Sequence, residues 1–396
     1  MEGPAPMTDQ QTLADTTAPG VPEGPDLLYS EPEDDLRAAV RSLLADRGGP
    51  AGVLAELESG RTHDAALWRS LAADIGAAGL LVPEKLGGQG AGPREAAVVL
   101  EELGRAVTPV PYLTSAVLAV TALLGCDTDE EEPARLLAAL ARGERIGVLA
   151  LPLTAAPGGP LEPTVRAGGD GALLGTVTSV ADAAAADVLL VPVRAADGIE
   201  LYAVDAGAPG LHIETVTPLD LTRGLARVTF DGAAGRRLAG ADRAGVAVRK
   251  ALLTGAGLLA SEQLGLAEWC LTEIVEYTKQ RHQFGRAVGS FQALKHRMAA
   301  LWLEVVSARA AARNAADALA TESPDAPVAV AVAQAYCAPV AVRAAQECLQ
   351  LHGGIGMTWE HPLHLFLKRA KSDEIALGAP GHHRAALAEL VDLTAP

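Results

Sequence analysis

Apolar residues recur with helical spacing in two separate parts of this 396-residue chain. In the first part, the stretch DDLRAAVRSLLADRG places Leu36, Val40 and Leu44 on one helical face and ends at two glycines. Three more helical patterns follow it, LWRSLAADIGAAGLLVPEKL, PREAAVVLEELGRA and YLTSAVLAVTALLG. We therefore expect a small all-helical domain over residues 34–145.

The pattern changes over residues 146–240. Short runs rich in Val, Leu and Thr stand between Gly, Pro and Asp turns: IGVLALPL, ALLGTVTSV, DVLLVPV, LYAVDA, LHIETVTPL and ARVTFDG. Such runs predict the strands of a small β-domain. Long helical patterns then return over residues 241–396, and their short joins predict a helical bundle. The expected fold class is α+β and mainly α.

Residues 1–33 have no apolar periodicity and are rich in Pro, Gly, Asp, Glu and Thr, which is typical of a disordered acidic tail. The first residues carry no basic flank followed by an apolar run, so no signal peptide is expected. No window approaches the ~20 uncharged apolar residues of a membrane span, so no membrane segment is predicted.

Composition narrows the choice of partners. The chain is 49% hydrophobic but only 3% aromatic, so its apolar residues are mainly Ala, Leu and Val, which favour closely packed helices. Its net charge of −17 argues against nucleic acid or an anionic membrane as a partner. The cysteines lie far apart without CxxC spacing and are typical of small buried residues in a reducing cytoplasm. They are Cys126, Cys270, Cys337 and Cys348.

One candidate binding motif is RHQFGRAVGSFQALKHRMA, which begins at Arg281. The Arg281 guanidinium is a planar, permanent cation suited to a pyrophosphate. Phe284 can lie against a flat ring, and Gln292 can donate or accept a hydrogen bond. Taken alone, the same residues fit an ordinary turn between two helices with a solvated arginine.

A second candidate motif is QLHGGIGMTWEH, which begins at Gln350. Gly353 and Gly354 allow a backbone to come close to a ligand at a helix end, and Gln350, one turn earlier, can reach the same ligand. A simple glycine helix cap explains the two glycines equally well.

Together with GLLVPEKLGGQG and EELGRA nearer the N-terminus, these motifs resemble the acyl-CoA dehydrogenase family over about residues 34–390. The resemblance implies a helical domain, a β-domain and a C-terminal four-helix bundle, assembled as a dimer or tetramer. It also implies bound FAD and oxidation of an acyl thioester, with a carboxylate removing the α-proton. The residues that it assigns to FAD are Arg281, Gln283, Phe284, Gln292, Gln350, Gly353 and Gly354.

The catalytic base of the family is missing from this chain. The resemblance places the usual base position at Leu377, and leucine cannot accept a proton. Some relatives carry the base on the long helix before an arginine, and that position falls at about Gly255, followed by Ala256. Glu262 faces the same side of that helix ~10 Å further along and is the remaining candidate. A surface or interface glutamate is the simpler interpretation of Glu262.

The β-domain departs from the family pattern as well. The region of the usual Thr-x-Glu-Pro stretch reads LALPLTAAPGGPL and has no acid, and Ser179 and Ala181 stand where a Trp-x-Thr is usual. The residues that resemble the flavin-ring end are therefore lost, whereas those at the pyrophosphate end are present. In this family the two ends of one FAD are held by different subunits.

Three functions follow from the resemblance. The first is an FAD-dependent dehydrogenase acting on the α,β bond of an acyl thioester of CoA or a carrier protein, with a separate electron acceptor. The second is a non-catalytic partner that completes the FAD site of a paralogue in a heterotetramer, rather than in a homotetramer. The third is a flavin oxidase or monooxygenase on the same scaffold.

Five histidines, His352, His361, His364, His382 and His383, lie near the C-terminus. Their spacing matches neither HExxH nor a compact zinc motif, so no metal site is predicted. We expect these histidines to be solvated or to lie at an interface.

Overall fold

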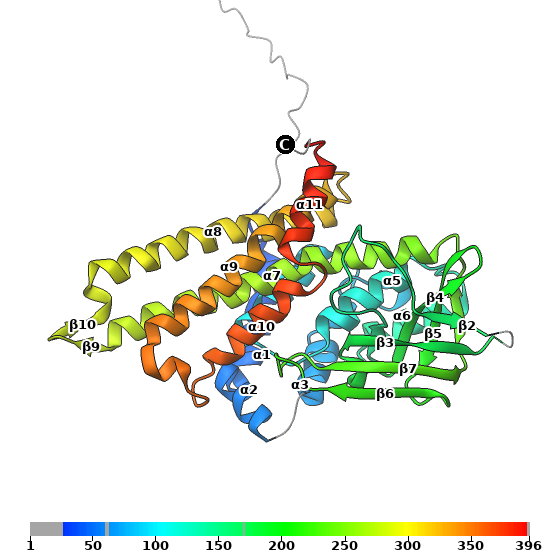
Figure 1. The fold of residues 1–396 in the computed structure, drawn as a ribbon, viewed down its shortest axis with the longest axis horizontal. Coiled ribbons are helices and arrows are strands. Elements are labelled where there is room, and N and C mark those ends of the chain that lie inside the picture. Colours follow the sequence, from blue (N-terminus) through cyan, green and yellow to red (C-terminus); the bar gives the residue numbers. More distant parts are fainter. Residues whose placement is uncertain (1–26, 60–62, 169–170, 394–396) are drawn as a thin grey trace, which may run out of the picture.

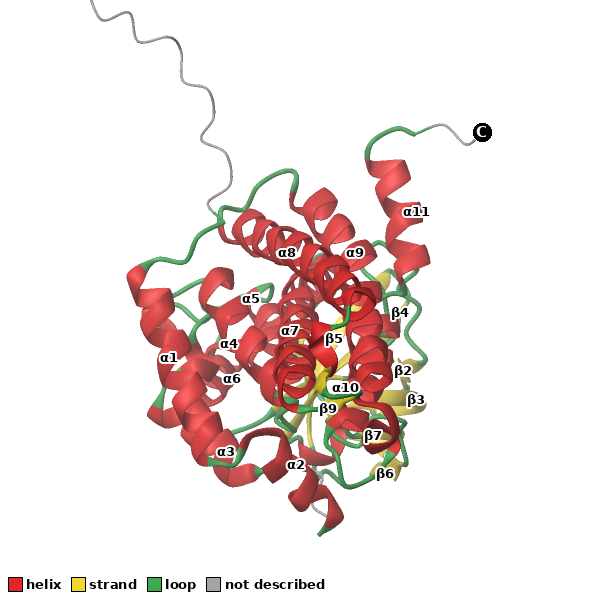
Figure 2. Ribbon diagram, turned by 90° about the vertical axis from the view of Figure 1, so that its left-hand side faces the viewer, coloured by secondary structure: helices red, strands yellow, loops and turns green. Residues whose placement is uncertain are grey.

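The computed structural model describes residues 27–59, 63–168 and 171–393. Its elements follow the helix–sheet–helix order expected from the sequence (Figure 1), and the predicted mainly helical α+β class is confirmed. The strands gather on one side of the molecule and the long helices occupy the other (Figure 2).

The N-terminal part is built from short helices. They are α1 (Glu31–Asp46), α2 (Gly49–Glu58), α3 (Ala65–Arg69), α4 (Pro93–Ala106), a π-helical turn (Tyr112–Ala119), α5 (Val120–Leu124) and α6 (Glu131–Ala141). The second predicted helix is wrong as a single element. After α3 the chain forms a π-helical turn, Ser70–Asp74, and then short 3-10 turns, because Gly76 takes a positive φ of 78° and Pro83 follows.

The expected tail boundary at residue 33 is also wrong. Helix α1 begins at Glu31, where Ser30 and Glu33 cap each other's backbone N–H groups. Just before it, the Tyr29 ring lies 3.9 Å from the Arg313 guanidinium, and the Tyr29 hydroxyl donates to Glu101 at 2.6 Å. Residues 1–26 of the predicted tail lie outside the described residues.

The central part is one sheet with the strand order β6-β7-β3-β2-β4-β5-β8, to which β1 adds by pairing with β4. The strands are β1 (Gly147–Leu149), β2 (Val165–Ala167), β3 (Leu173–Ala181), β4 (Val188–Ala195), β5 (Gly198–Asp205), β6 (Leu211–Val216), β7 (Leu225–Ala233) and β8 (Arg236–Ala239). The six strand-like runs of the sequence all contain strands, whereas the short strands β2 and β8 were missed because they lie outside these runs.

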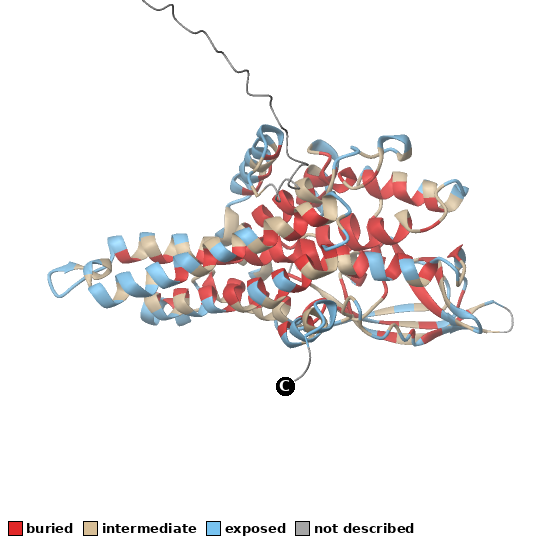
Figure 3. Ribbon diagram, turned by 90° about the horizontal axis from the view of Figure 1, so that it is seen from above, coloured by how far each residue is buried: buried red, intermediate tan, exposed pale blue. Residues whose placement is uncertain are grey.

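The C-terminal part contains long helices and one small hairpin. They are α7 (Ala244–Gln280), β9 (His282–Gln283), β10 (Arg286–Ala287), α8 (Gln292–Ala320), α9 (Ala326–His352), α10 (Leu363–Ile375) and α11 (Pro380–Leu390). Buried residues concentrate where α7 crosses the N-terminal helices, while the hairpin end of α7 and α8 is largely exposed (Figure 3).

Among the residues that the structure describes, one helical stretch, Ala326–Met357, is long and apolar enough to cross a membrane by length and composition. The prediction that no window approaches this level is therefore wrong. In the fold, α9 packs against α7, α8, α10 and α11, and 67% of the most apolar window is buried inside the protein. The apolar surface of α9 is thus covered by helices of the same chain, as in a core helix.

Helices α4 and α7 cross with their backbones in close contact, because each has a glycine at the crossing point. A Cβ atom on Gly104 would lie 2.2 Å from the carbonyl oxygen of Glu262, and one on Gly265 would lie 2.0 Å from that of Glu101. Both obstacles are backbone atoms, so neither can rotate away. The crossing fixes α7, and with it Glu262, relative to the N-terminal helices.

We expect Gly265→Ala to lower the free energy of unfolding by about 1–3 kcal/mol, because the added methyl group overpacks this crossing. Denaturant unfolding followed by circular dichroism measures the change. Gly245→Ala on the same helix is the control, since its Cβ would meet nothing within 4 Å. It should raise stability by up to about 1 kcal/mol through helix propensity. Equal stabilities of the two variants would contradict the close crossing.

Candidate functional site

The C-terminal ends of α7 and α9 meet at a groove of about 550 Å³. Four of the residues assigned to FAD from the sequence, Arg281, Gln350, Gly353 and Gly354, line this groove together. They come from two motifs about seventy residues apart, so the fold unites what the sequence shows as separate signals. Tyr277, Arg297 and His352 also line the groove and were not predicted.

The groove offers both charge and open backbone to an anionic ligand. Arg281 is exposed, and within the described residues its guanidinium pairs with no carboxylate. A Cβ atom on Gly353 or Gly354 would meet nothing within 4 Å, so the backbone there is open, and Gly353 has a φ of 62° that favours glycine. A free guanidinium beside an accessible backbone fits a pyrophosphate.

The other three predicted FAD residues lie outside the lining of this groove. Gln283 stands in the β9–β10 hairpin, Phe284 is 91% exposed at its turn, and Gln292 opens α8 with an exposed side chain. The Phe284 ring meets the edge of Phe291 at 6.1 Å between centroids and is otherwise open to solvent. Their assignment to the cofactor stays a prediction.

The two expected base positions lie against each other. A Cβ atom on Gly255 of α7 would lie 3.1 Å from Leu377 and 2.4 Å from Leu118. Leu377 is 2% exposed, and its backbone N–H donates to the Leu153 carbonyl at 2.7 Å. Neither position carries an acid, and Gly255 has no room for one, because Leu118 already fills the space above it.

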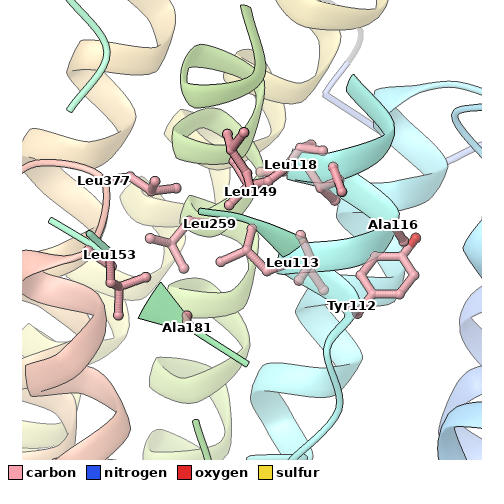
Figure 4. Close-up of a cluster of buried hydrophobic side chains, with 14 of the residues drawn as sticks. Tyr112, Leu113, Ala116, Leu118, Leu149, Leu153, Ala181, Leu259 and Leu377 are labelled. Carbon is pink, nitrogen blue, oxygen red and sulfur yellow. The ribbon is translucent and has the colours of Figure 1, made fainter. Parts of the chain in front are cut away.

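The side chain of Leu377 has apolar neighbours. Leu377, Leu118, Leu149, Leu153 and Leu259 lie in one buried cluster contributed by several elements (Figure 4). Ala181, at the place of the usual Trp-x-Thr, lies in the same cluster (Figure 4). We call this group the leucine plug. It occupies the region where the resemblance places the proton-abstracting group, and no carboxylate is among these residues.

Glu262 does not face the leucine plug. Its two carboxylate oxygens both accept from the Arg223 guanidinium at 2.8 Å, and one of them also accepts from Arg369. Burial alone would raise the pKa of Glu262, but the two arginines outweigh it and hold the pKa below its usual value. The side chain is 2% exposed, so the expected surface position is wrong. As a buried carboxylate that two arginines keep ionised, Glu262 is a poor acceptor for a substrate proton.

Glu262 belongs to a buried ionic cluster that joins three parts of the fold. Arg369 of α10 donates to Asp220 and Thr222 in the β6–β7 loop at 2.6 Å, and Arg223 of the same loop pairs with Asp373 of α10. One local signal for this cluster was missed, because Arg369 and Asp373 stand one helical turn apart on α10.

The cluster holds three acids, Asp220, Glu262 and Asp373, against two arginines, Arg223 and Arg369, so it cannot be neutral with every group ionised. The group that carries the extra proton is Asp373, whose side chain is fully buried. Burial and the nearby charge of Glu262 raise the pKa of Asp373 to about 7. Oδ2 of Asp373 has no hydrogen-bond partner among the described residues, which leaves room for the proton.

The histidines were expected at the surface or an interface, and two of them are not there. His352 and His383 are each 2% exposed. His383 lies beneath the turn after α10, where its ring is 3.0 Å from the Leu377 carbonyl oxygen. His352 lies under the glycine turn of the groove.

Comparison with known proteins identifies the family of this chain. The family model of the acyl-CoA dehydrogenase N-terminal domain matches residues 30–144, and that of the C-terminal domain matches residues 245–391. The chain belongs to the acyl-CoA dehydrogenase family. The resemblance drawn from the motifs is thereby confirmed, and with it an acyl-CoA dehydrogenase-type function among the flavoprotein oxidoreductases of lipid metabolism.

The family relatives are similar over nearly the whole chain. Acyl-CoA dehydrogenase IpdE2 of Mycobacterium tuberculosis is 37% identical over 345 residues, which is 87% of this chain and 92% of that protein. The structure of the ChsE4-ChsE5 complex from Mycobacterium tuberculosis matches with a TM-score of 0.80 and 30% identity, covering 94% of this chain and all of that one. The Tcur3481-Tcur3483 steroid ACAD matches with a TM-score of 0.79 and 30% identity, covering 91% and 98%.

We expect Asp373→Asn to gain stability relative to the unaltered chain as pH rises. The native carboxyl has a pKa of about 7, against roughly 4 in the unfolded chain, so its contribution to stability is present at low pH and is lost as pH rises through 7. Between pH 5.5 and 8 the relative gain should be about 1–2 kcal/mol. Urea unfolding at both pH values measures it.

Glu374→Gln is the matched control, because Glu374 is the next residue and pairs with Lys371 at 2.8 Å on the outer side of α10. Its stability difference from the unaltered chain should be the same at both pH values. If Asp373→Asn also kept a constant difference, Asp373 would not hold the extra proton.

Proposed function

We propose that this chain is the non-catalytic subunit of a heteromeric acyl-CoA dehydrogenase and completes the FAD site of a catalytic paralogue. One observation carries the proposal: the leucine plug fills the position of the base, while the groove around Arg281 is intact. This chain therefore lacks the catalytic half of the family site and keeps the half that binds the pyrophosphate end of FAD. Such a subunit can contribute its groove to the FAD site of a partner, although it cannot catalyse the reaction itself.

The plug prevents this chain from abstracting a proton. Removing the weakly acidic α-proton of a thioester requires a basic group within hydrogen-bond reach, and in this family that group is a carboxylate. Leu377 and Gly255 offer none, and the carboxylate of Glu262 is held by Arg223 and Arg369. An oxidase or monooxygenase that starts by removing the same proton needs such a base too, so these observations also argue against that alternative.

The groove suits one end of a dinucleotide. Arg281 can form two parallel hydrogen bonds to a pyrophosphate, Gln350 can bond to a polar edge, and the turn at Gly353 lets the backbone approach. FAD, when bound, supplies the hydride acceptor, and the base and flavin-ring contacts come from the paralogue. The groove opens at the exposed end of α7 and α9, where a second chain has access.

Exposed apolar residues on α8, on the hairpin and at the end of the glycine turn support assembly with another chain. Phe284 is 91% exposed, Trp302 58%, Leu303 61% and Met357 73%. Several exposed large apolar side chains on the elements that form a ligand groove favour a protein interface. The named heteromers ChsE4-ChsE5 and Tcur3481-Tcur3483 support a paralogue rather than a second copy as the partner.

The substrate of the assembly is proposed to be the CoA or carrier-protein thioester of a bulky, steroid-like acid, because one similar heteromer is named a steroid ACAD. Electrons leave to a separate acceptor protein. The proposed location is the cytoplasm, in keeping with four free and buried cysteines.

We expect the chain purified alone to be colourless and inactive, and the chain co-purified with a paralogue that carries the missing carboxylate to be yellow and to bleach with an acyl-CoA. Arg281→Ala in this chain should weaken flavin retention by the complex roughly ten- to hundredfold, the cost of a lost charged hydrogen-bond pair. Flavin absorbance after gel filtration measures it.

Lys279→Ala is the control, since it removes a cation of the same charge two residues earlier, where Lys279 pairs with Glu276 at 2.8 Å. It should leave flavin retention unchanged. Stoichiometric FAD together with acyl-CoA turnover by the isolated chain would refute the proposal.

A further inference from the structure

Beside the groove lies a cluster of three side chains that neither the sequence motifs nor the proposed function explains. Glu273 stands on α7, His352 ends α9, and His361 follows the glycine turn. One potential ligand atom from each lies within 4.8 Å of the other two. We propose that Glu273, His352 and His361 bind one divalent transition-metal ion of the zinc class.

The ligand set is of the right kind. Two imidazoles and one carboxylate are a known three-residue arrangement for zinc, with a further position left open for a water or another ligand. Tetrahedral zinc with bonds of about 2.0–2.1 Å holds neighbouring ligand atoms about 3.3 Å apart. Nε2 of His352 and Oε1 of Glu273 are already 3.8 Å apart. Glu273 and His361 are both only half-buried, so their side chains have room to rotate towards that spacing.

His352 is oriented as a metal-binding histidine is. Its Nδ1 lies 2.8 Å from the Cys348 carbonyl oxygen, so Nδ1 carries the hydrogen and donates it. The lone pair is then on Nε2, which is buried and has no hydrogen-bond partner among the described residues. A ring hydrogen donated to a backbone carbonyl is the usual second contact of a histidine ligand. The ring is held in place by stacking on Tyr277, with centroids 4.2 Å apart.

His361 needs one adjustment to bind the metal through Nε2. Its Nδ1 now accepts from the Leu363 N–H at 3.3 Å, a long hydrogen bond. Coordination through Nε2 moves the ring hydrogen to Nδ1 and releases that contact, which belongs to the first turn of α10. The ring already faces His352, with centroids 5.0 Å apart.

Without a metal, the cluster has a different resting state. Burial opposes the charged form of His352, but contacts with Cys348 and the nearby carboxylate of Glu273 outweigh burial and raise the pKa of His352. Glu273 then pairs with an imidazolium. A metal ion takes the place of that proton between the same two groups, so an ion pair without any metal affinity is the competing explanation.

The proposed metal site lies next to the ligand groove, because His352 belongs to the cluster and also lines the groove. Its open coordination position could therefore be filled by an oxygen of a bound phosphate. This part of the inference rests on the proposed function, whereas metal binding by the free chain does not. The two can fail separately.

The test is a titration of the chelator-treated full chain with Zn²⁺, followed by calorimetry against a competing chelator, and with Co²⁺, followed by visible absorption. We expect one ion per chain and the ligand-field bands of four- or five-coordinate Co²⁺. Glu273→Gln and His361→Asn, both at half-exposed positions, should each weaken Zn²⁺ binding about tenfold or more, with circular dichroism checking that each variant is folded.

His364→Asn is the matched control. His364 comes three residues after His361 but faces Trp359 and Lys368 instead of the cluster, so this variant should bind Zn²⁺ as the unaltered chain does. Binding that is absent, substoichiometric or unaffected by the Glu273 and His361 substitutions would overturn the inference and leave only the ion pair. Flavin retention by the chelated heteromer tests the proposed function independently.

Discussion

The buried ionic cluster is the interaction on which the arrangement of this chain depends. Arg223, Glu262 and Arg369 connect the β6–β7 loop, α7 and α10 at a point where all three side chains are at most 5% exposed. Charged groups are costly to bury, and removal of one partner from such a group usually costs about 3–5 kcal/mol because the other remains unpaired. The sheet and the helical bundle are therefore held in one relative position.

This fixed position decides what lies in the family's catalytic region. Helix α10 is tied at Arg369 and Asp373, and the chain leaves it two residues later towards Leu377. Leu377 is thus delivered against Gly255 and Leu118, with its backbone bonded to Leu153. The ion pairs that hold Glu262 also fix the end of α10, and this places Leu377 in the leucine plug. Loss of the base and capture of the nearest other carboxylate are two results of one packing arrangement.

Sequence reasoning succeeded where the signal is local. The periodicity of α7 to α9, the six strand runs and the motifs around Arg281 and Gly353 are contained in short windows, and the fold joins the two motifs in one groove. Sequence reasoning failed where contacts join residues that are distant in the chain. Neither the pairing of Arg223 with Glu262 nor the approach of Glu273 to His361 has a spacing signature, since the partners lie on separate elements. Glu262 looked like a surface residue because its partners are 39 and 107 positions away.

The groove and the plug place opposite demands on their surroundings. A leucine plug stabilises the chain only when it is dry and closed, and Leu377 is 2% exposed in the chain by itself. A ligand groove must stay open. In the hairpin that follows α7, Phe284 remains 91% exposed, and this exposure of an aromatic ring does not stabilise an isolated chain. The half of the site that has lost its chemistry is therefore complete within this chain. Under the proposed function, a second chain completes the half that keeps its binding residues, which is the asymmetry expected of a subunit that serves its neighbour's cofactor.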